Sequence, residues 1–283
     1  MAEQSKSSKK NLLSSSVTND DKIKAVKFFW DGYRNGFSYI INKYLYTGKP
    51  PIKNPVFNEA ELDKFEYLKE QVEDELERMT HTTKEIRLKT IDDALKIYIQ
   101  ALESAFQMNL DWRVFSTENT KLFRGINELP SDINKVLDVN KSFLSTSPLI
   151  DVAVTHAHEL NLKEGKPAFI IEYDIEPGIP MIDMDKLGHD IMMVWQQEFV
   201  LPPGLTSTLI AEGTYTVPPV EKTKTLKTKK KVGKKNVYEY TEEKYTEPGY
   251  TLPLFKVRIS KTISTAVTAT GGRKRTTKDR KLN

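Results

Sequence analysis

The sequence has no cysteine and no long apolar run, and each absence excludes a class of protein. Without cysteine there can be no disulfide framework, no thiol nucleophile and no thiolate metal site. No stretch of about 18 apolar residues occurs, so no transmembrane helix is expected. The first 20 residues also lack the apolar centre of a secretory signal peptide. We expect a soluble, intracellular protein whose compartment the sequence leaves open.

The positive charge of the chain is concentrated in two segments. Residues 221–235 contain eight lysines and one glutamate, and residues 271–283 contain six basic residues and one aspartate. The rest of the chain carries 29 basic against 37 acidic residues, a formal charge of about −8. Nucleic-acid-binding proteins usually carry positive charge on the folded face that meets phosphate. The acidic body argues against such a role, and only the two basic segments leave one open.

Apolar residues at alternating steps of three and four predict helices in the first third of the chain. A disordered lead is expected over residues 1–20. The first apolar stripe then comprises Ile23, Val26, Trp30, Tyr33, Phe37, Ile40 and Tyr44. A second helix is predicted to follow Asn58, an N-cap with Glu61 three residues later, and a third to span residues 83–108. Residues 21–110 are therefore expected to form a helical block.

The character of the chain changes over residues 120–259, which we expect to be β-rich. One helix is predicted over residues 149–160. Strands after a block of helices indicate the α+β class, here in a single domain over residues 21–259. Within it, residues 217–249 are expected to be a charged insertion, and residues 260–283 a basic, flexible tail. The predicted strands are rich in β-branched or aromatic residues and span 122–126, 142–147, 168–175, 198–201, 208–215 and 251–259.

Three short motifs follow one another in the β-rich part. They are Leu122-Phe123-Arg124-Gly125, Phe143-Leu144-Ser145-Thr146-Ser147 and Gln196-Gln197-Glu198-Phe199-Val200-Leu201-Pro202-Pro203. In this order they resemble the Arg–Ser–Glu signature of the mono-ADP-ribosyltransferases, in the branch of bacterial exotoxins and related viral and phage enzymes. The segment Tyr33-x-x-Gly36-Phe37-x-x-Ile40-Ile41-Asn42 is similar to the helical motif that precedes the catalytic strands in that family.

The resemblance implies a fold, a substrate and a reaction. The fold is a helical block packed on a split β-sandwich, with NAD bound between the sheets. The reaction moves ADP-ribose from NAD to a side chain of an acceptor protein and releases nicotinamide. With water as the acceptor, the same reaction is NAD hydrolysis. This chemistry requires no metal.

The resemblance also implies roles for single residues. Glu198 stabilises the positive charge that develops on the ribose and bonds the ribose 2′-hydroxyl. Ser145 orients that carboxylate, and Arg124 clamps the pyrophosphate with a planar, permanently charged guanidinium. Gly125 is expected to let the ligand approach the backbone.

Five further residues are expected to contact NAD or the acceptor. Tyr33 lies on the apolar stripe and fits core packing as well as NAD contact, whereas Asn42 lies off the stripe and is the better ligand candidate. Thr146 is a candidate NAD contact, although its side chain points away from that of Ser145 and fits a structural role. Trp195 and Met193 belong to the loop that would present the acceptor.

The residue two positions before Glu198 departs from the arginine-modifying enzymes. They carry glutamate there, whereas this chain has Gln196, on the same face of the predicted strand. An amide cannot attract and deprotonate a guanidinium, so an asparagine-like acceptor is favoured over arginine. The Gln-x-Glu pair also resembles guanine-modifying DNA toxins. No arginine follows Arg124 until the last predicted strand, so a second phosphate contact is expected from Lys163 or Lys166.

Two alternatives remain at this point. The first is guanine ADP-ribosylation of DNA or nucleotides, with the basic segments 221–235 and 271–283 holding phosphate. The second is a catalytically silent interaction module on the same fold. A metal site is not expected, because His156 and His158 stand two apart on a predicted helix and point in different directions. The lysine-rich ends are similar in style to proteins of large DNA viruses.

Overall fold

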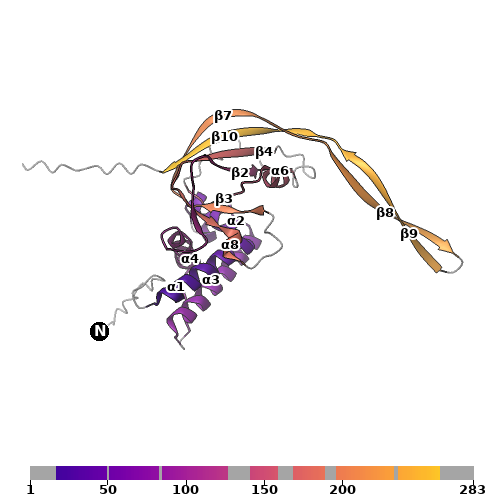
Figure 1. The fold of residues 1–283 in the computed structure, drawn as a ribbon. Helices are drawn as coiled ribbons and strands as arrows, with labels where there is room; N and C mark the ends of the chain where they lie inside the picture. Colours follow the sequence, from indigo (N-terminus) through magenta and orange to yellow (C-terminus); the bar gives the residue numbers. More distant parts are fainter. Residues whose placement is uncertain are drawn as a thin grey trace, which may run out of the picture.

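The computed structural model describes residues 17–49, 51–82, 85–126, 141–158, 168–188, 196–232 and 235–261. The fold is α+β, which confirms the predicted class: a helical block lies against two β-sheets (Figure 1). Within the described ranges, no helix is both long and apolar enough to cross a membrane. Most of the predicted lead and tail fall outside the described residues.

The helical block consists of α1 (Asn19–Gly32), α2 (Ser38–Thr47), α3 (Glu59–Thr80) and α4 (Ile91–Ala105), with a 3-10 turn at Pro51–Lys53. The predicted capping box of Asn58 and Glu61 at the start of α3 is confirmed. α1 begins before the predicted lead ends, because Thr18 caps it through the Asp21 amide. α4 begins later than predicted, because Thr90 caps it at Ile91.

The first predicted helix is interrupted by a π-helical turn over Tyr33–Phe37, between α1 and α2. Gly36 in this turn has a φ of 144°, a backbone conformation that side chains with a Cβ rarely adopt. The glycine of the Tyr33-x-x-Gly36 motif is therefore required by the backbone. Such π turns inside helices are frequent at functional sites.

The β-rich part contains two four-stranded sheets. The first has the order β1 (Arg113–Phe115), β5 (Pro180–Asp183), β6 (Phe199–Leu201) and β3 (Leu144–Thr146). The second has the order β2 (Thr120–Ile126), β4 (Phe169–Ile175), β10 (Tyr250–Lys261) and β7 (Leu205–Val217). All pairings are antiparallel except that of β4 with β10. Strands β1 and β5 were not predicted, because they are short and lack a clear alternating pattern.

The two sheets pack face to face and touch along one line. Leu144 and Leu201 of the first sheet share a buried cluster with Phe169 and Val257 of the second. At one edge an isolated pair of backbone hydrogen bonds between Phe123 and Ser147 connects β2 to the end of β3. The predicted β-sandwich is thus split at this line, which runs next to Arg124 and Ser145.

An aromatic cluster anchors β3 to the helical block. The ring of Phe143, directly before β3, lies 5.7 Å from the rings of both Trp30 and Tyr33 and stacks on Phe106 at 6.2 Å, between centroids. All four side chains are buried. The strand that carries Ser145 therefore takes its position from the core of the helices.

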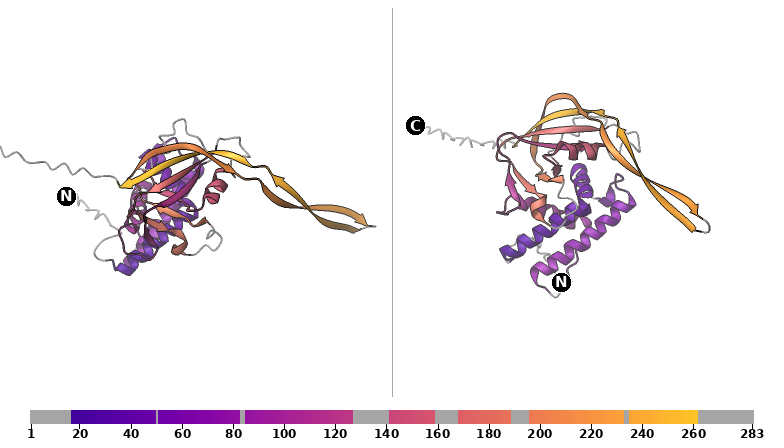
Figure 2. Two further views of the ribbon diagram at one scale, coloured as in Figure 1. Left: turned by 45° about the horizontal axis from the view of Figure 1, so that its top comes forward. Right: turned by 45° about the vertical axis from the view of Figure 1, so that its right-hand side comes forward.

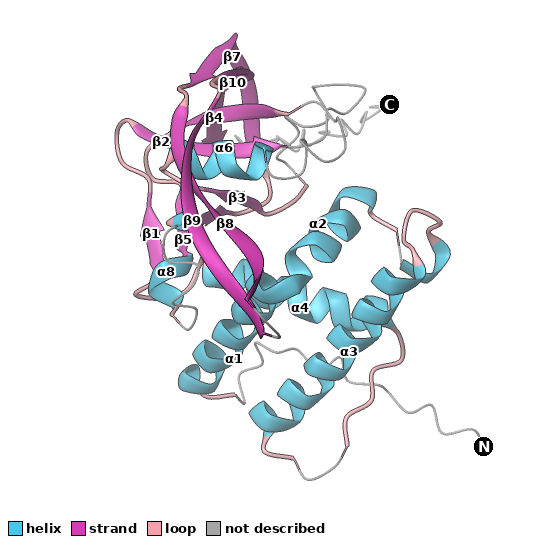
Figure 3. Cartoon of the chain, turned by 90° about the vertical axis from the view of Figure 1, so that its right-hand side faces the viewer, coloured by secondary structure: helices cyan, strands magenta, loops and turns pink. Residues whose placement is uncertain are grey.

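Helix α6 (Ile150–His158) covers β2 at Gly125 (Figure 3). A Cβ at Gly125 would overlap the carbonyl oxygen of Ala153 and lie 2.7 Å from the amide nitrogen of Ala157. The expectation that this glycine makes room for a ligand is therefore wrong in its reason: the space above it is filled by the α6 backbone.

The predicted charged insertion contains a long two-stranded ribbon, β8 (Val220–Val232) paired with β9 (Lys235–Glu247). We call this ribbon the arm. It continues the direction of the β7–β10 pair and extends away from the body (Figures 1 and 2). Pro218 and Pro219 on one side, with Pro248 and Gly249 on the other, separate it from that pair because proline breaks the ladder.

Replacing Gly125 by alanine is expected to lower the free energy of unfolding by about 1–3 kcal/mol, the usual cost of overpacking. The added methyl group meets backbone atoms of α6, which cannot rotate away as a side chain would. Urea unfolding measures the effect, with Gly213→Ala as the control, since no atom lies within 4 Å of a Cβ there. Equal stability of the two variants would contradict the packing of α6 on β2.

Candidate active site

The predicted Arg124 and Ser145 meet at the line where the two sheets touch. Arg124 on β2 donates a hydrogen bond from Nη1 to the carbonyl oxygen of Ser145 on β3, at 3.1 Å. Both side chains are partly exposed. The neighbours of Ser145 in β3 are buried on the opposite face, which is the alternation expected of a strand.

Two buried hydroxyl side chains hold the backbone on both sides of Glu198. Thr146 donates to the carbonyl oxygen of Phe199 at 2.8 Å, and Ser147 donates to that of Gln196 at 2.6 Å. The Thr146 hydroxyl is thus occupied within the protein, and its side chain is 4% exposed. Thr146 serves here to position the loop of Glu198.

The segment before β6 is not a strand, which corrects one step of the sequence analysis. β6 begins at Phe199, and Gln197 has a φ of 44°, in the left-handed region. The alternation that would place Gln196 and Glu198 on one face therefore does not extend to them. The carbonyl oxygen of Glu198 accepts a hydrogen bond from the Met184 amide at 2.9 Å, which fixes the residue from a third direction.

A chain of hydrogen bonds connects Glu198 to the helical block. Ser145 hydrogen-bonds to the Glu198 carboxylate and also to the Tyr33 hydroxyl. That hydroxyl accepts a hydrogen bond from Asn42 Nδ2 at 2.9 Å, and Asn42 Oδ1 accepts one from the amide of Phe143 at 3.1 Å. Asn42 thus lies behind the site, with both ends of its amide engaged, and Tyr33 is a core residue whose hydroxyl reaches the site.

The surroundings of Glu198 act on its charge in opposite directions. Burial raises the pKa of the carboxyl group, whereas the Ser145 hydrogen bond and the positive charges of Arg34, Arg124 and His156 lower it. Burial prevails, and the pKa of Glu198 is raised above its ordinary value of 4.5. The site therefore holds a carboxylate that is ready to gain from any positive charge placed beside it.

Arg34 belongs to the site but was not predicted from the sequence. Its side chain is 8% exposed, and Nη1 donates to the carbonyl oxygen of Met184 at 3.2 Å. Nη2 lies 3.9 Å from Asp185 Oδ1, and neither atom has a hydrogen-bond partner among the described residues. An arginine one residue after Tyr33 looked like a surface cation; its place in the family-like helical motif was the available signal.

His156 is the second site residue that was not predicted as one. It lies on α6, exposed, close enough for its charge to act on Glu198. From its spacing it was considered only as a metal ligand. Among the residues that the structure describes, no group of three or more His, Asp or Glu is arranged to hold a metal ion.

Several predicted contacts fall outside the described residues. They are the acceptor-loop residues Trp195 and Met193 and the candidate phosphate contacts Lys163 and Lys166. The short helix α8 (Met184–Leu187), capped by Asp183, marks the beginning of the acceptor loop.

Comparison with known proteins adds only distant likenesses. No protein family and no curated protein matches the chain. Among solved structures, the chain is similar to Plx2a, an ADP-ribosyltransferase toxin from Paenibacillus larvae, at 13% identity and a TM-score of 0.34, over 87% of this chain and 88% of that one. It is also similar to C2-I, the enzymatic component of the C2 toxin from Clostridium botulinum, at 13% identity and a TM-score of 0.41, over 86% of this chain and 44% of that one.

A third similar structure is another ADP-ribosyltransferase from Clostridium botulinum, at 11% identity and a TM-score of 0.33, over 86% of this chain and 88% of that one. At these identities and scores the likenesses decide nothing about chemistry. The case for a function rests on the geometry around Glu198.

Replacing Glu198 by glutamine is expected to raise the Tm near neutral pH by a few degrees. Because the native pKa of Glu198 is raised, its neutral form favours folding: this stabilisation is complete below pH 4.5 and is lost as the pH rises through the native pKa. Near neutral pH the ionised carboxylate therefore costs stability, and an amide does not.

Thermal unfolding of both proteins near neutral pH and below pH 4.5 measures this difference. The gain should vanish at the lower pH, and Glu66→Gln, at an exposed position on α3, should show no gain at either. A Glu198→Gln protein less stable than the wild type near neutral pH would contradict the assignment.

Proposed function

We propose that this protein is a mono-ADP-ribosyltransferase that moves ADP-ribose from NAD to a protein side chain and releases nicotinamide. The observation that carries the proposal is the meeting of Arg124, Ser145 and Glu198 at the line between the two sheets, with the carboxylate hydrogen-bonded by the serine. These three residues come from separate strands or strand ends, and the fold brings them together.

The residues of the site match the charges of the reaction. When the bond between nicotinamide and ribose breaks, nicotinamide leaves with the electron pair and positive charge develops on the sugar. The carboxylate of Glu198 stabilises that charge, and its partial burial strengthens the interaction because little water screens it. Ser145 holds the carboxylate in one orientation.

Arg124 and Arg34 supply permanent positive charge for the diphosphate of the substrate. Both guanidinium groups act on Glu198 electrostatically, so both lie close to it. Arg124 is partly exposed and suited to direct contact, whereas Arg34 is buried and contributes through its field and by holding Met184. Arg34 thus replaces part of the charge that the sequence analysis sought at Lys163 and Lys166.

Gln196 favours an asparagine-like acceptor over arginine. The new bond forms between the sugar and an acceptor nitrogen, which must lose a proton. A guanidinium would need a second carboxylate to remove that proton, and the amide of Gln196 cannot do so. An amide acceptor is better matched by hydrogen bonds from another amide.

A second candidate is transfer to guanine in DNA, for which the arm provides a specific observation. Its far half is rich in lysine and contains no acidic residue. The acceptor class decides between the two: label from NAD that survives nuclease but not protease belongs to a protein, and the reverse pattern indicates nucleic acid.

Replacement of Glu198 by alanine is expected to lower nicotinamide release from NAD by about 100-fold or more, the usual loss when a preorganised electrostatic group is removed. Purified protein is incubated with NAD labelled in the adenylate moiety, with and without cell lysate, and released nicotinamide and transferred label are both measured. Glu66→Ala, on the exposed face of α3, serves as the matched control and should keep full activity.

Release and labelling that both vanish in Glu198→Ala support the transferase. Release without labelling of any acceptor would reduce the proposal to NAD hydrolysis. No release by the wild-type protein would contradict an enzyme of this kind and favour the interaction module.

A further inference from the structure

The arm is strongly polarised in charge along its length. Residues 227–238, which form its far end, contain six lysines and no acidic residue. All five glutamates of the arm lie at position 221 or between 239 and 247, nearer the body. An ion pair between Lys222 and Glu247 balances charge at the base. Positive charge therefore accumulates at the end that is farthest from the fold.

One face of the arm combines lysine with tyrosine. The register places Lys227 opposite Tyr240 and Lys229 opposite Tyr238, so these four side chains share a face. Lys227 Nζ lies 4.2 Å from the Tyr238 ring centroid, and the tyrosines are 47% and 62% exposed at positions 238 and 240. We call this set the basic face. The intervening position of β8, Thr228, stands opposite Glu239 on the other face.

The extension of the arm removes the objection raised by the acidic body. Each strand has 13 residues, which span about 40 Å at the usual rise per residue. Lys227 stands seven residues beyond Val220, about 23 Å from the base by the same measure. The Debye length at physiological ionic strength is only about 8 Å. The charge of the body is therefore largely screened at the basic face (Figure 2).

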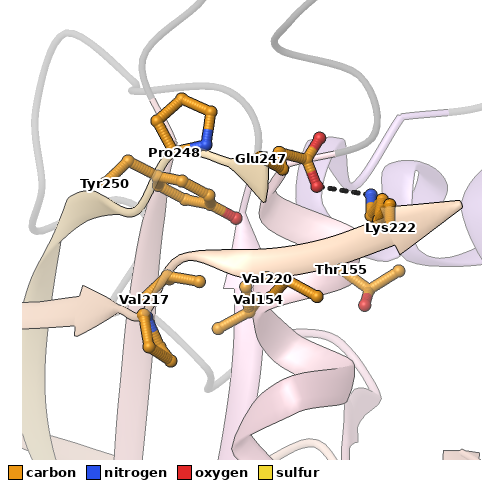
Figure 4. A pocket seen from close by; sticks show the side chains of 9 residues that line it. Val154, Thr155, Val217, Val220, Lys222, Glu247, Pro248 and Tyr250 are labelled. Atoms are coloured by element: carbon orange, nitrogen blue, oxygen red, sulfur yellow. Dashed lines mark ion pairs between the residues drawn. The ribbon is translucent and has the colours of Figure 1, made fainter. Parts of the chain in front are cut away.

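The base of the arm is built against α6. A hollow there is lined by Val154 and Thr155 of α6 and by Val220 and Tyr250 of the strands, beside the Lys222–Glu247 pair (Figure 4). None of the lining residues belongs to the site around Glu198. The same helix covers Gly125 and carries His156, so one element supports both the arm and the site.

We propose that the basic face of the arm binds duplex DNA, with the ribbon lying in the major groove. A two-stranded β-ribbon is one of the few elements that the groove, about 12 Å wide, admits. Lysine and tyrosine side chains donate hydrogen bonds to phosphate oxygens, and neither Lys227 nor Lys229 stands opposite a carboxylate. Duplex RNA fits less well, because its major groove is narrow and deep.

A membrane surface is a poorer partner for the same face. Elements that bind the lipid interface place apolar side chains such as leucine or tryptophan beside their basic residues. The basic face has tyrosine in place of these, and Leu226 lies on the other face, opposite Thr241. The neighbouring Glu239 and Glu243 of that other face would repel an anionic lipid layer.

The test is binding of the full-length protein to a fluorescently labelled DNA duplex of about two helical turns, measured by anisotropy over a range of salt concentrations. The double variant Lys227→Gln/Lys229→Gln should lose about tenfold in affinity at ~100 mM salt, and its salt slope should fall by about 2. Lys24→Gln/Lys64→Gln is the matched control, with the same charge change at exposed positions of the helical block. Thermal unfolding checks that each variant remains folded.

The proposal is overturned if the wild-type protein does not bind the duplex or if the control loses as much affinity as the arm variant. It is also overturned if single-stranded DNA, duplex RNA or phosphatidylserine vesicles bind more tightly than the duplex. The measurement needs neither NAD nor turnover, so its outcome is independent of the transferase proposal.

Discussion

The place of Glu198 depends on a hydrogen-bonded chain that crosses from the sheets into the helical block. Ser145 contacts the carboxylate, and Tyr33 and Asn42 continue the chain to the backbone before β3. Because the Tyr33 ring is also part of the aromatic core, packing of the helices and orientation of the carboxylate are one problem. The partly buried carboxylate costs stability when ionised. Such a cost is usually retained where a function requires the charge.

The electrostatics of the molecule divide into two regions. Around Glu198, two arginines and a histidine surround one carboxylate at the meeting line of the sheets. On the arm, lysines and tyrosines gather far from the acidic body, beyond the range of its field in salt. Helix α6 contacts both regions, since it covers β2 beside Arg124 and lines the hollow at the base of the arm. A partner held by the arm would thus be bound next to an element of the site.

The sequence predicted features that depend on local pattern and missed those that depend on distant contacts. The capping box at Asn58 and the α+β order follow from neighbouring residues, and both are confirmed. The role of Gly125 was mistaken because the α6 backbone that covers it comes from later in the chain. Arg34 was missed because a single arginine on a helix gives no sign that α8 will bury it. The arm was expected as a charged insertion, but only pairing of its two strands reveals a lysine–tyrosine face.

The most direct test of the account is the pKa of Glu198 itself, measured by NMR titration of protein labelled with carbon-13 at the glutamate carboxyl groups. The Glu198 resonance is identified by its absence in Glu198→Gln. The account predicts a midpoint above 4.5 in the wild type and a higher one in Ser145→Ala, because that variant loses a hydrogen bond to the ionised form. A midpoint at or below 4.5, or one that Ser145→Ala leaves unchanged, would contradict the claim that a partly buried carboxylate is held there by Ser145.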